Sequence, residues 1–247
     1  MREEAYKIKI NGDSGLSIVF GQGISVECNR KVHTFAKQLK AMKIKGILSI
    51  IPSYCELLIV YKPLLLSYET IYHKLKAALK NLQIEEETIA EVVYIPVLYG
   101  GLHGCDLDSL AQQHNISTEK VIQLHTAPYY RIYMLGFKPG FPYLAGMDKK
   151  LVSSRLSSPR LSVAAGSVGI AGEQTGIYPQ DSPGGWQLIG HTPLNLIDWT
   201  CDEINLLKPG QYIKFYSVDQ ANYNQIKSAV EVGCYKAEIR QLKEVAL

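Results

Sequence analysis

Hydrophobic and polar positions in the first 90 residues follow two periods. Strand-like alternation is predicted at 5–10, 16–20, Ile47–Ile51 and Leu57–Tyr61. After Ser25 the apolar residues recur at intervals of four and three, which places them on one stripe of a helix. Ser67 is positioned to cap a second such helix. With a further strand near Ile89–Ile95, this order is typical of a split βαβ unit and predicts a ferredoxin-like domain at 1–90.

The pattern changes after about Val92, where short apolar runs alternate with Gly and Pro. We expect strands at Tyr129–Leu135, Leu194–Ile197, Tyr212–Val218 and Tyr235–Ile239. Asp106, Ser117 and Asp219 each stand where they could cap a helix. The predicted fold class is therefore α+β, with a closed or nearly closed β-barrel at 91–218. A helix and strand extension follows at 219–247. The acidic run Glu85–Glu87 is expected to be an exposed break between the two domains.

The stretch from Arg131 to Asp198 has the densest set of glycines and prolines. Glycine permits positive φ angles and close approach to a ligand or another strand. Charged residues are few in it, and Arg131, Lys138, Arg160, Glu173 and Asp181 are among them. Isolated polar groups among special backbone positions indicate a shaped pocket. A small barrel whose corners need glycine would have the same composition, so both interpretations stay open.

Composition excludes several functional classes. The 247 residues carry a net charge of +3 and no Lys/Arg run of the kind that binds nucleic acid. Apolar stretches stay well short of the roughly 20 residues that span a bilayer, and the charged N-terminal segment Met1–Glu4 lacks the apolar core of a signal peptide, so a cytoplasmic protein is expected. The five cysteines are scattered, and the six histidines match no metal motif, so no metal site is predicted. The sequence contains no P-loop and no nucleophile elbow.

Two residues are predicted to be catalytic. Arg160 follows Pro159, and a guanidinium held in this way suits bidentate recognition of a carboxylate or phosphate. The alternative for Arg160 is an ion pair within the fold or a surface position. His125 stands at a helix end and is a candidate general acid or base; the alternative is a histidine that satisfies free helix carbonyls.

Six further residues are predicted to bind substrate. Gln174, Tyr178 and Gln187 are neutral hydrogen-bonding groups suited to an amide or lactam, although they could equally satisfy barrel backbone. Trp186 is either a core anchor or an aromatic pocket wall. Lys138, beside a Pro-Gly turn, and Tyr143 complete the set.

Six motifs together resemble the KipI / allophanate hydrolase subunit 1 family. They are Leu124–Thr126, Tyr133–Leu144, Ser158–Arg160, Ala165–Gly172, Gln174–Pro179 and Ser182–Gly190. The resemblance implies a ferredoxin-like N-terminal domain and a cyclophilin-like β-barrel. Three positions depart from the family pattern: Gly104-Cys-Asp-Leu107, Ala164-Ala-Gly166 and Gly172-Glu-Gln174.

The same resemblance implies a function. It implies ATP-dependent opening of 5-oxoproline to glutamate together with companion 5-oxoprolinase subunits of types A and C, with ATP shared with a partner subunit. The absence of any nucleotide motif in this sequence points to such a composite site. Two alternatives remain open: an inhibitor of a sporulation histidine kinase, and a subunit of an enzyme that hydrolyses allophanate or a urea-derived amide.

Overall fold

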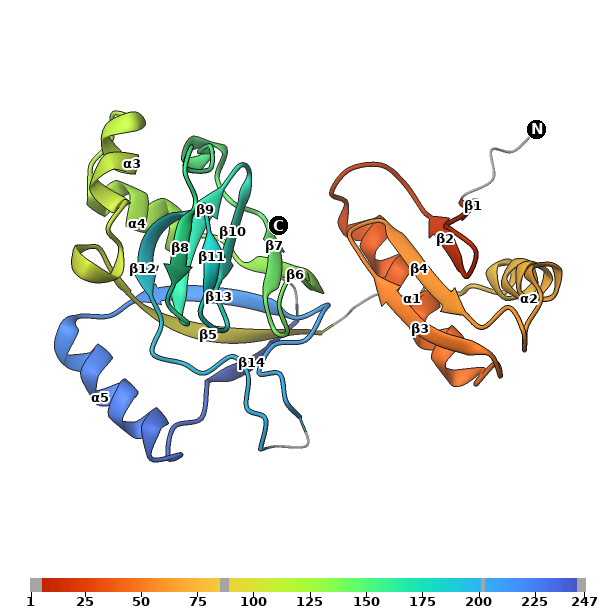
Figure 1. The fold of residues 1–247 in the computed structure, drawn as a ribbon. Helices are drawn as coiled ribbons and strands as arrows, with labels where there is room; N and C mark the ends of the chain where they lie inside the picture. The colour runs from red at the N-terminus through yellow and green to blue at the C-terminus, as the bar shows by residue number, and fades with distance from the viewer. Residues whose placement is uncertain (1–5, 85–88, 201–202, 244–247) are drawn as a thin grey trace. The chain divides into compact units, whose positions relative to one another are not determined.

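A computed structural model describes residues 6–84, 89–200 and 203–243. The chain forms two compact units, Met1–Glu87 and Thr88–Leu247, which differ in architecture (Figure 1). The expected break at Glu85–Glu87 lies outside the described residues. Each unit has its own hydrophobic core.

The first unit is a four-stranded antiparallel sheet with two helices. Its strands are β1 (Lys7–Ile10), β2 (Gly15–Val19), β3 (Ile47–Pro52) and β4 (Glu56–Tyr61), in the order β1-β2-β4-β3. The helices are α1 (Val26–Ala41) and α2 (Tyr68–Lys80). Ser67 caps α2 as predicted, and Ser25 caps α1 at the predicted helix start; each hydroxyl accepts a backbone N–H. The split βαβ unit therefore consists of β2, α1 and β3, with β4 between the two strands.

The strand predicted near Ile89–Ile95 does not belong to this first sheet. It is β5 (Ala90–Tyr99), which lies in the second unit and pairs there with β12, β13 and β14. In the first unit the edge position beside β2 is occupied by β1, from the start of the chain. The predicted order of elements along the sequence is thus confirmed, but the seventh element, β5, belongs to the sheet of the second unit.

The second unit is built around a nearly closed β-barrel. Its main path runs β10-β9-β12-β5-β13-β6-β7, and β14 adds to β5. The terminal strands β10 and β7 lie against each other, which nearly closes the sheet (Figure 1). The bounds are β6 (Tyr130–Leu135), β7 (Pro142–Ala145), β9 (Ser167–Ala171), β10 (Gln174–Ile177), β12 (Gln187–His191), β13 (Tyr212–Ser217) and β14 (Ile239–Leu242). A separate ribbon pairs β8 (Arg160–Val163) with β11 (Ser182–Gly184).

Helices accompany this barrel: α3 (Leu107–Gln113), α4 (Thr118–Thr126) and α5 (Gln220–Glu231), with the short 3₁₀ helices η1 (Gly101–His103) and η2 (Lys149–Leu151). Ser117 and Asp219 cap α4 and α5 as predicted. The predicted extension at 219–247 contributes α5 and β14, so it adds a strand to the central β5.

Two strand predictions of the second unit are wrong. The strand predicted at Tyr235–Ile239 begins only at Ile239, as β14, and residues 235–238 are irregular. Residues Leu194–Ile197 form no strand, and only an isolated bridge joins Ile197 to Asn205. The alternation that suggested a strand reflects burial, because Leu194 and Leu196 are buried while Asn195 is exposed. Alternating burial can arise in irregular chain that runs over a core.

Two further predictions concern membranes and metals. In the described part of the chain, no helix combines the length and apolar character needed to cross a membrane. Within residues 6–84, 89–200 and 203–243, no group of three or more His, Cys, Asp or Glu side chains could hold a metal ion. The cysteines at 28, 55, 105 and 234 are free thiols.

Candidate functional site

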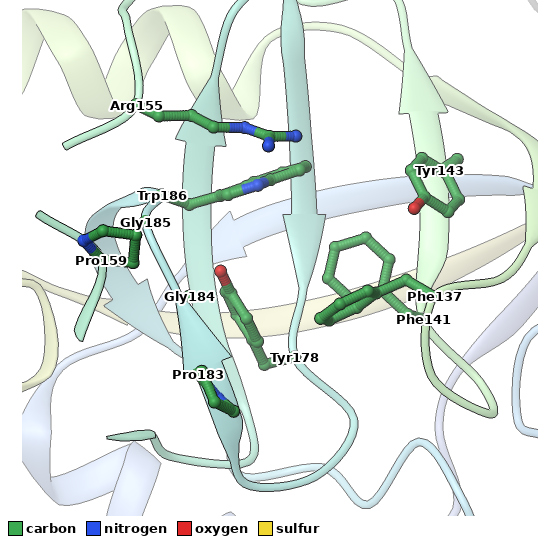
Figure 2. Close-up of a pocket in the computed structure, with 10 residues that line it drawn as sticks. All are labelled: Phe137, Phe141, Tyr143, Arg155, Pro159, Tyr178, Pro183, Gly184, Gly185 and Trp186. Carbon is green, nitrogen blue, oxygen red and sulfur yellow. The ribbon is translucent and has the colours of Figure 1, made fainter. Parts of the chain in front are cut away.

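A cavity of about 250 Å³ lies in the second unit, lined mainly by aromatic side chains (Figure 2). We call it the aromatic pocket. Its lining residues are Phe137, Phe141, Tyr143, Arg155, Pro159, Tyr178, Pro183, Gly184, Gly185 and Trp186. Three predicted substrate-binding residues therefore meet here: Tyr143, Tyr178 and Trp186.

The pocket wall is a small hydrophobic cluster separate from the barrel core. Phe141 stands at its centre and meets Trp186 and Tyr178 edge to face, with ring centroids 5.5 and 5.6 Å apart. Tyr143 packs against Phe141 at 5.2 Å. Such pairs are each worth about 0.5–1.5 kcal/mol beyond area burial. Trp186 is both a core anchor and a pocket wall, because it is only 7% exposed and its ring also lines the cavity.

Gly184 sets the position of the Tyr178 hydroxyl. A Cβ at residue 184 would collide with that hydroxyl, so the ring can reach this place only beside glycine. Burial raises the pKa of Tyr178, while a backbone hydrogen bond from Trp186 and the charges of Arg155 and Arg160 act in the opposite direction. Tyr178 therefore enters the pocket as a neutral phenol that can donate or accept a hydrogen bond.

Phe137 forms the rim of the pocket on a strained turn. Its φ is +63°, and the backbone N–H of Lys138 donates to the carbonyl of Gly136 at 2.7 Å, which makes Phe137 the centre of a γ-turn. The ring is 64% exposed and meets Phe141 edge to face. A bulky residue with positive φ is uncommon, and such strain concentrates at binding sites.

Arg155 is the cation of the pocket, and the sequence analysis missed it. It lies in the loop between η2 and β8, is exposed, and forms no ion pair with any residue in the described ranges. In Figure 2 its guanidinium and the Trp186 indole extend into the pocket from the same side, facing Tyr143. The only signal in the sequence is its place five residues before Arg160, in the same proline-containing segment.

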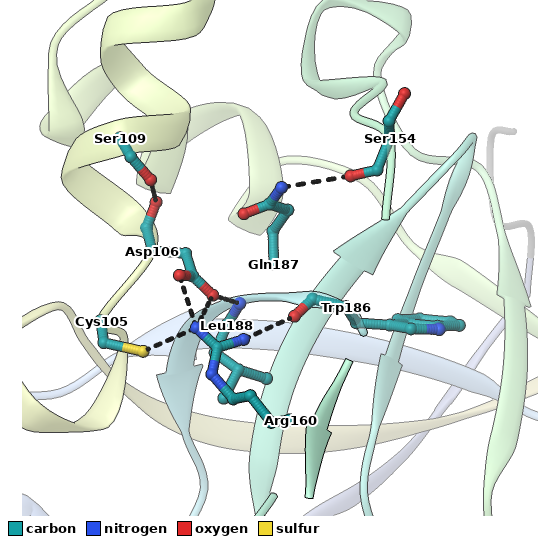
Figure 3. Close-up of polar contacts among 8 residues, drawn as sticks. All are labelled: Cys105, Asp106, Ser109, Ser154, Arg160, Trp186, Gln187 and Leu188. Atoms are coloured by element: carbon teal, nitrogen blue, oxygen red, sulfur yellow. Dashed lines mark hydrogen bonds and ion pairs between the residues drawn. The ribbon is translucent and has the colours of Figure 1, made fainter. Parts of the chain in front are cut away.

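Arg160 is engaged elsewhere, in the ion pair that was its alternative interpretation (Figure 3). Its Nη2 donates to both carboxylate oxygens of Asp106 at 2.7 and 2.9 Å, and Nη1 donates to the Trp186 carbonyl at 3.3 Å. Burial lowers the pKa of Arg160, but the hydrogen bond and charge of Asp106 outweigh that effect and the pKa rises. Arg160 does not line the aromatic pocket; it holds the backbone that carries Trp186.

Asp106 is the other half of this network. The backbone N–H of Leu188 donates to its Oδ2 at 2.6 Å (Figure 3). The predicted capping bond from Asp106 to α3 is absent. Its carboxylate instead joins β12 to Arg160, at the start of β8, which fixes two sides of the segment containing Trp186.

His125 is buried in the barrel core, away from the pocket. The Thr175 hydroxyl donates to the Gly169 carbonyl, so it accepts from Nε2–H of His125 at 2.8 Å, and Nδ1 then accepts from the Tyr99 hydroxyl at 2.7 Å. These bonds select the neutral Nε2–H tautomer. Burial lowers the pKa of His125 from 6.5 to about 3. With no exposed surface and both ring nitrogens occupied, His125 has no atom free for a substrate.

Three other predicted residues lie outside the aromatic pocket. Gln187 is buried and donates from Nε2 to the Ser154 carbonyl at 3.1 Å (Figure 3), which is the backbone-satisfying alternative. Gln174 begins β10 and pairs with Ala171 in the hairpin with β9. Lys138 follows Phe137 on the rim turn and is half-buried.

Comparison with known proteins places this architecture in a family. The family described as "Carboxyltransferase domain, subdomain C and D" matches residues 6–207. The chain is 40% identical over 232 residues to the B-type subunit of the 5-oxoprolinase of Bacillus subtilis, covering 90% of this chain and 97% of that protein. It is 39% identical over 195 residues to the corresponding B-type subunit of Haemophilus influenzae, covering 77% and 88%. The chain therefore belongs to the carboxyltransferase subdomain C and D family, which confirms the KipI / allophanate hydrolase subunit 1 resemblance.

Solved structures support the same fold. TTHA0988 is 38% identical with a TM-score of 0.74 over 83% of this chain, which spans 40% of that protein's length. The conserved uncharacterised protein PH0987 of Pyrococcus horikoshii is 41% identical with a TM-score of 0.52, and the match covers 88% of this chain and 100% of PH0987. The K. lactis urea amidolyase shares the fold at 18% identity, with a TM-score of 0.80 over 96% of this chain and 16% of that protein.

Proposed function

We propose that this chain is a B-type subunit of a 5-oxoprolinase, which opens 5-oxoproline to L-glutamate with ATP. The observation that carries the proposal is the 40% identity across 97% of the length of the Bacillus subtilis B-type subunit. The protein is proposed to be cytoplasmic. The first unit is proposed to be ferredoxin-like, with β1 instead of β5 at the edge beside β2. The second unit is proposed to be cyclophilin-like.

The aromatic pocket supports this proposal through its size and polarity. A cavity of about 250 Å³ is below the range of drug-sized sites and suits a small ring. The Arg155 guanidinium would bind the carboxylate of 5-oxoproline through two parallel hydrogen bonds. Phe141 and Trp186 would enclose the ring, and the hydroxyls of Tyr143 and Tyr178 would meet the amide. Arg155 thus takes the anchoring role that the sequence had suggested for Arg160.

The pocket does not fit ATP. It is small, and Arg155 is the single cation among its lining residues, with no glycine-rich phosphate cradle. We therefore place the nucleotide on companion subunits of types A and C, so that the active site is composite. Opening a lactam is uphill without coupling, and ATP supplies the driving force there. The part of this chain is to bind and orient the substrate and to exclude water from it.

Reconstitution tests the proposal. The purified chain alone should neither hydrolyse ATP nor open 5-oxoproline, and addition of the A and C counterparts should produce glutamate in an ATP-dependent reaction. Robust ATP hydrolysis by the lone chain would contradict the composite site. If the A and C counterparts are fully active without this chain, the alternative of a regulatory inhibitor of a histidine kinase replaces the enzymatic one.

Two arginine variants separate binding from structure. In the reconstituted complex Arg155→Met should lower kcat/KM for 5-oxoproline at least tenfold, since losing a charge-assisted bond costs more than about 1.4 kcal/mol. Its melting temperature should stay unchanged because Arg155 is exposed. The matched control Arg160→Met should lower the melting temperature, because it leaves the largely buried Asp106 carboxylate without its cation. Normal turnover in Arg155→Met would remove Arg155 from the site.

A second candidate function comes from the urea amidolyases. The chain is 27% identical over 144 residues to the urea amidolyase of Saccharomyces cerevisiae, covering 55% of this chain and 8% of that protein. The matching family is described as a carboxyltransferase domain. Action on a urea-derived amide is therefore the alternative substrate class. Allophanate carries a carboxylate as 5-oxoproline does, so the product distinguishes the two candidates: the reconstituted complex releases glutamate from 5-oxoproline in the first case and ammonia from urea or allophanate in the second.

A further inference from the structure

A second cavity, of about 260 Å³, lies in the barrel unit beside α5. We call it the α5 cavity. It shares no residue with the aromatic pocket. Pro179, Leu194 and Ile197 give it an apolar surface, while His191, Asn195 and Lys227 supply its polar groups.

One wall of the α5 cavity is held rigidly. The Tyr223 hydroxyl, on α5, lies 2.9 Å from Nδ1 of His191, at the end of β12, and Tyr223 is only 3% exposed. The ring of His103 lies 5.3 Å from His191 and 5.0 Å from Tyr223, centroid to centroid. Gly166 has φ +85°, and a Cβ there would collide with the His191 imidazole. The chain therefore keeps a glycine where His191 needs room.

The charge of the α5 cavity is positive. No Asp or Glu is among its lining residues, and Lys227 forms no ion pair with any residue in the described ranges. Burial lowers the pKa of His191, and the nearby His103 and Lys227 lower it further, against backbone hydrogen bonds at Ala165 and Thr192 that raise it. Lys227 is thus the lysine that lines the α5 cavity.

The backbone N–H groups around the α5 cavity favour a carboxylate over a phosphate. A phosphate site usually gathers several backbone N–H groups in one concavity. Here the backbone N–H of Gly166 donates to the Tyr178 carbonyl, and that of Thr192 donates to the Gly166 carbonyl. The N–H of Leu194 donates to the Thr192 hydroxyl. The N–H of Ala165 donates to Asp181, and the two prolines have none. Among the side chains, one ammonium and one amide are available, since the Asn195 side chain bonds to no other described residue. These groups match a single carboxylate.

We propose that the α5 cavity binds a small organic monocarboxylate. Lys227 pairs with the carboxylate, Asn195 donates a hydrogen bond to it, and the hydrocarbon part lies against Pro179, Leu194 and Ile197. The His191–Tyr223 pair forms the rigid wall behind it. This site goes beyond the proposed 5-oxoprolinase function and does not depend on it.

Two-dimensional amide NMR of the full chain at pH 7 tests the site with propionate. Saturable shifts are expected at 164–166, 191–197 and 223–227. The neutral isostere propionamide should bind at least tenfold more weakly, and inorganic phosphate should not saturate these positions. Shifts confined to the residues around Arg155, or equal responses to propionamide or phosphate, would overturn the proposal.

Matched lysine variants complete the test. Lys227→Met should raise the propionate Kd at least tenfold, whereas Lys236→Met removes an exposed charge elsewhere in the same unit and should leave it unchanged. Arg155→Met should also leave these shifts intact, because Arg155 lines only the other pocket. Wild-type affinity in Lys227→Met would remove the charge partner and with it the proposed site.

Discussion

His125 links a single residue to the pH dependence of stability. In the unfolded chain its pKa is the ordinary 6.5, whereas burial lowers the pKa to about 3 in the folded protein. Between these values the unfolded state binds more protons. The folded state therefore has its full stability above pH 6.5 and loses it as the pH falls toward 3. At about 1.36 kcal/mol per pH unit, this one group costs about 2.7 kcal/mol at pH 4.5.

The variant His125→Gln should remove this part of the pH dependence. Urea unfolding at pH 7.5 and 4.5 measures it, with tryptophan fluorescence as the probe, because both tryptophans lie in the barrel unit. The drop in free energy of unfolding should be about 2.7 kcal/mol smaller in the variant than in the wild type. A histidine NMR signal of His125 that titrates near pH 6.5 would contradict the buried neutral state.

At the residue scale, the sequence predicts local contacts well and long-range contacts poorly. Ser67, Ser117 and Asp219 cap helices as predicted, because a cap depends on residues two or three positions away. Asp106 occupies the same kind of position, but its carboxylate binds Arg160, 54 residues further along the chain. A charge-assisted pair outweighs a neutral cap, and its partner is set by the barrel topology.

At the scale of elements, the turn between β6 and β7 carries the pocket rim in a strained conformation. Phe137→Gly and Phe137→Ala both remove the ring, but only glycine adopts a φ of +63° without a steric cost. The glycine variant should therefore be about 1 kcal/mol more stable than the alanine variant. Urea unfolding measures the difference. Equal stabilities would show that the γ-turn stores no strain.

Element boundaries show which interactions a sequence pattern cannot convey. Two strands of the first unit were predicted at 47–51 and 57–61, and they agree with β3 and β4 to within a residue. The strand near 89–95 was also found, but its pairing with β12, β13 and β14 is decided by residues more than 90 positions away. The pocket follows the same rule: three residues predicted to bind substrate, Tyr143, Tyr178 and Trp186, line it, while Arg155 and Phe137 enter through loop geometry.

At the scale of the whole molecule, the second unit is expected to fold independently of the first. All strands of the barrel path and β14 lie within 88–247, and each unit has its own core. We expect the fragment 88–247 to fold alone. Its thermal unfolding should be cooperative, with the same tryptophan fluorescence as the full chain, because both tryptophans lie in this unit. Loss of cooperative unfolding would mean that the barrel needs the first unit.

The shorter fragment 88–218, which ends where the predicted barrel ends, should not fold in the same way. It lacks β14, which pairs with Ala90–Val93 of β5, and Tyr223 of α5, which is buried against His191. Removing them exposes an unpaired strand edge and apolar surface of the core, both of which promote aggregation. We expect this fragment to aggregate or to unfold without a cooperative transition, as measured by thermal circular dichroism. A melting temperature equal to that of 88–247 would instead make residues 219–247 a dispensable extension.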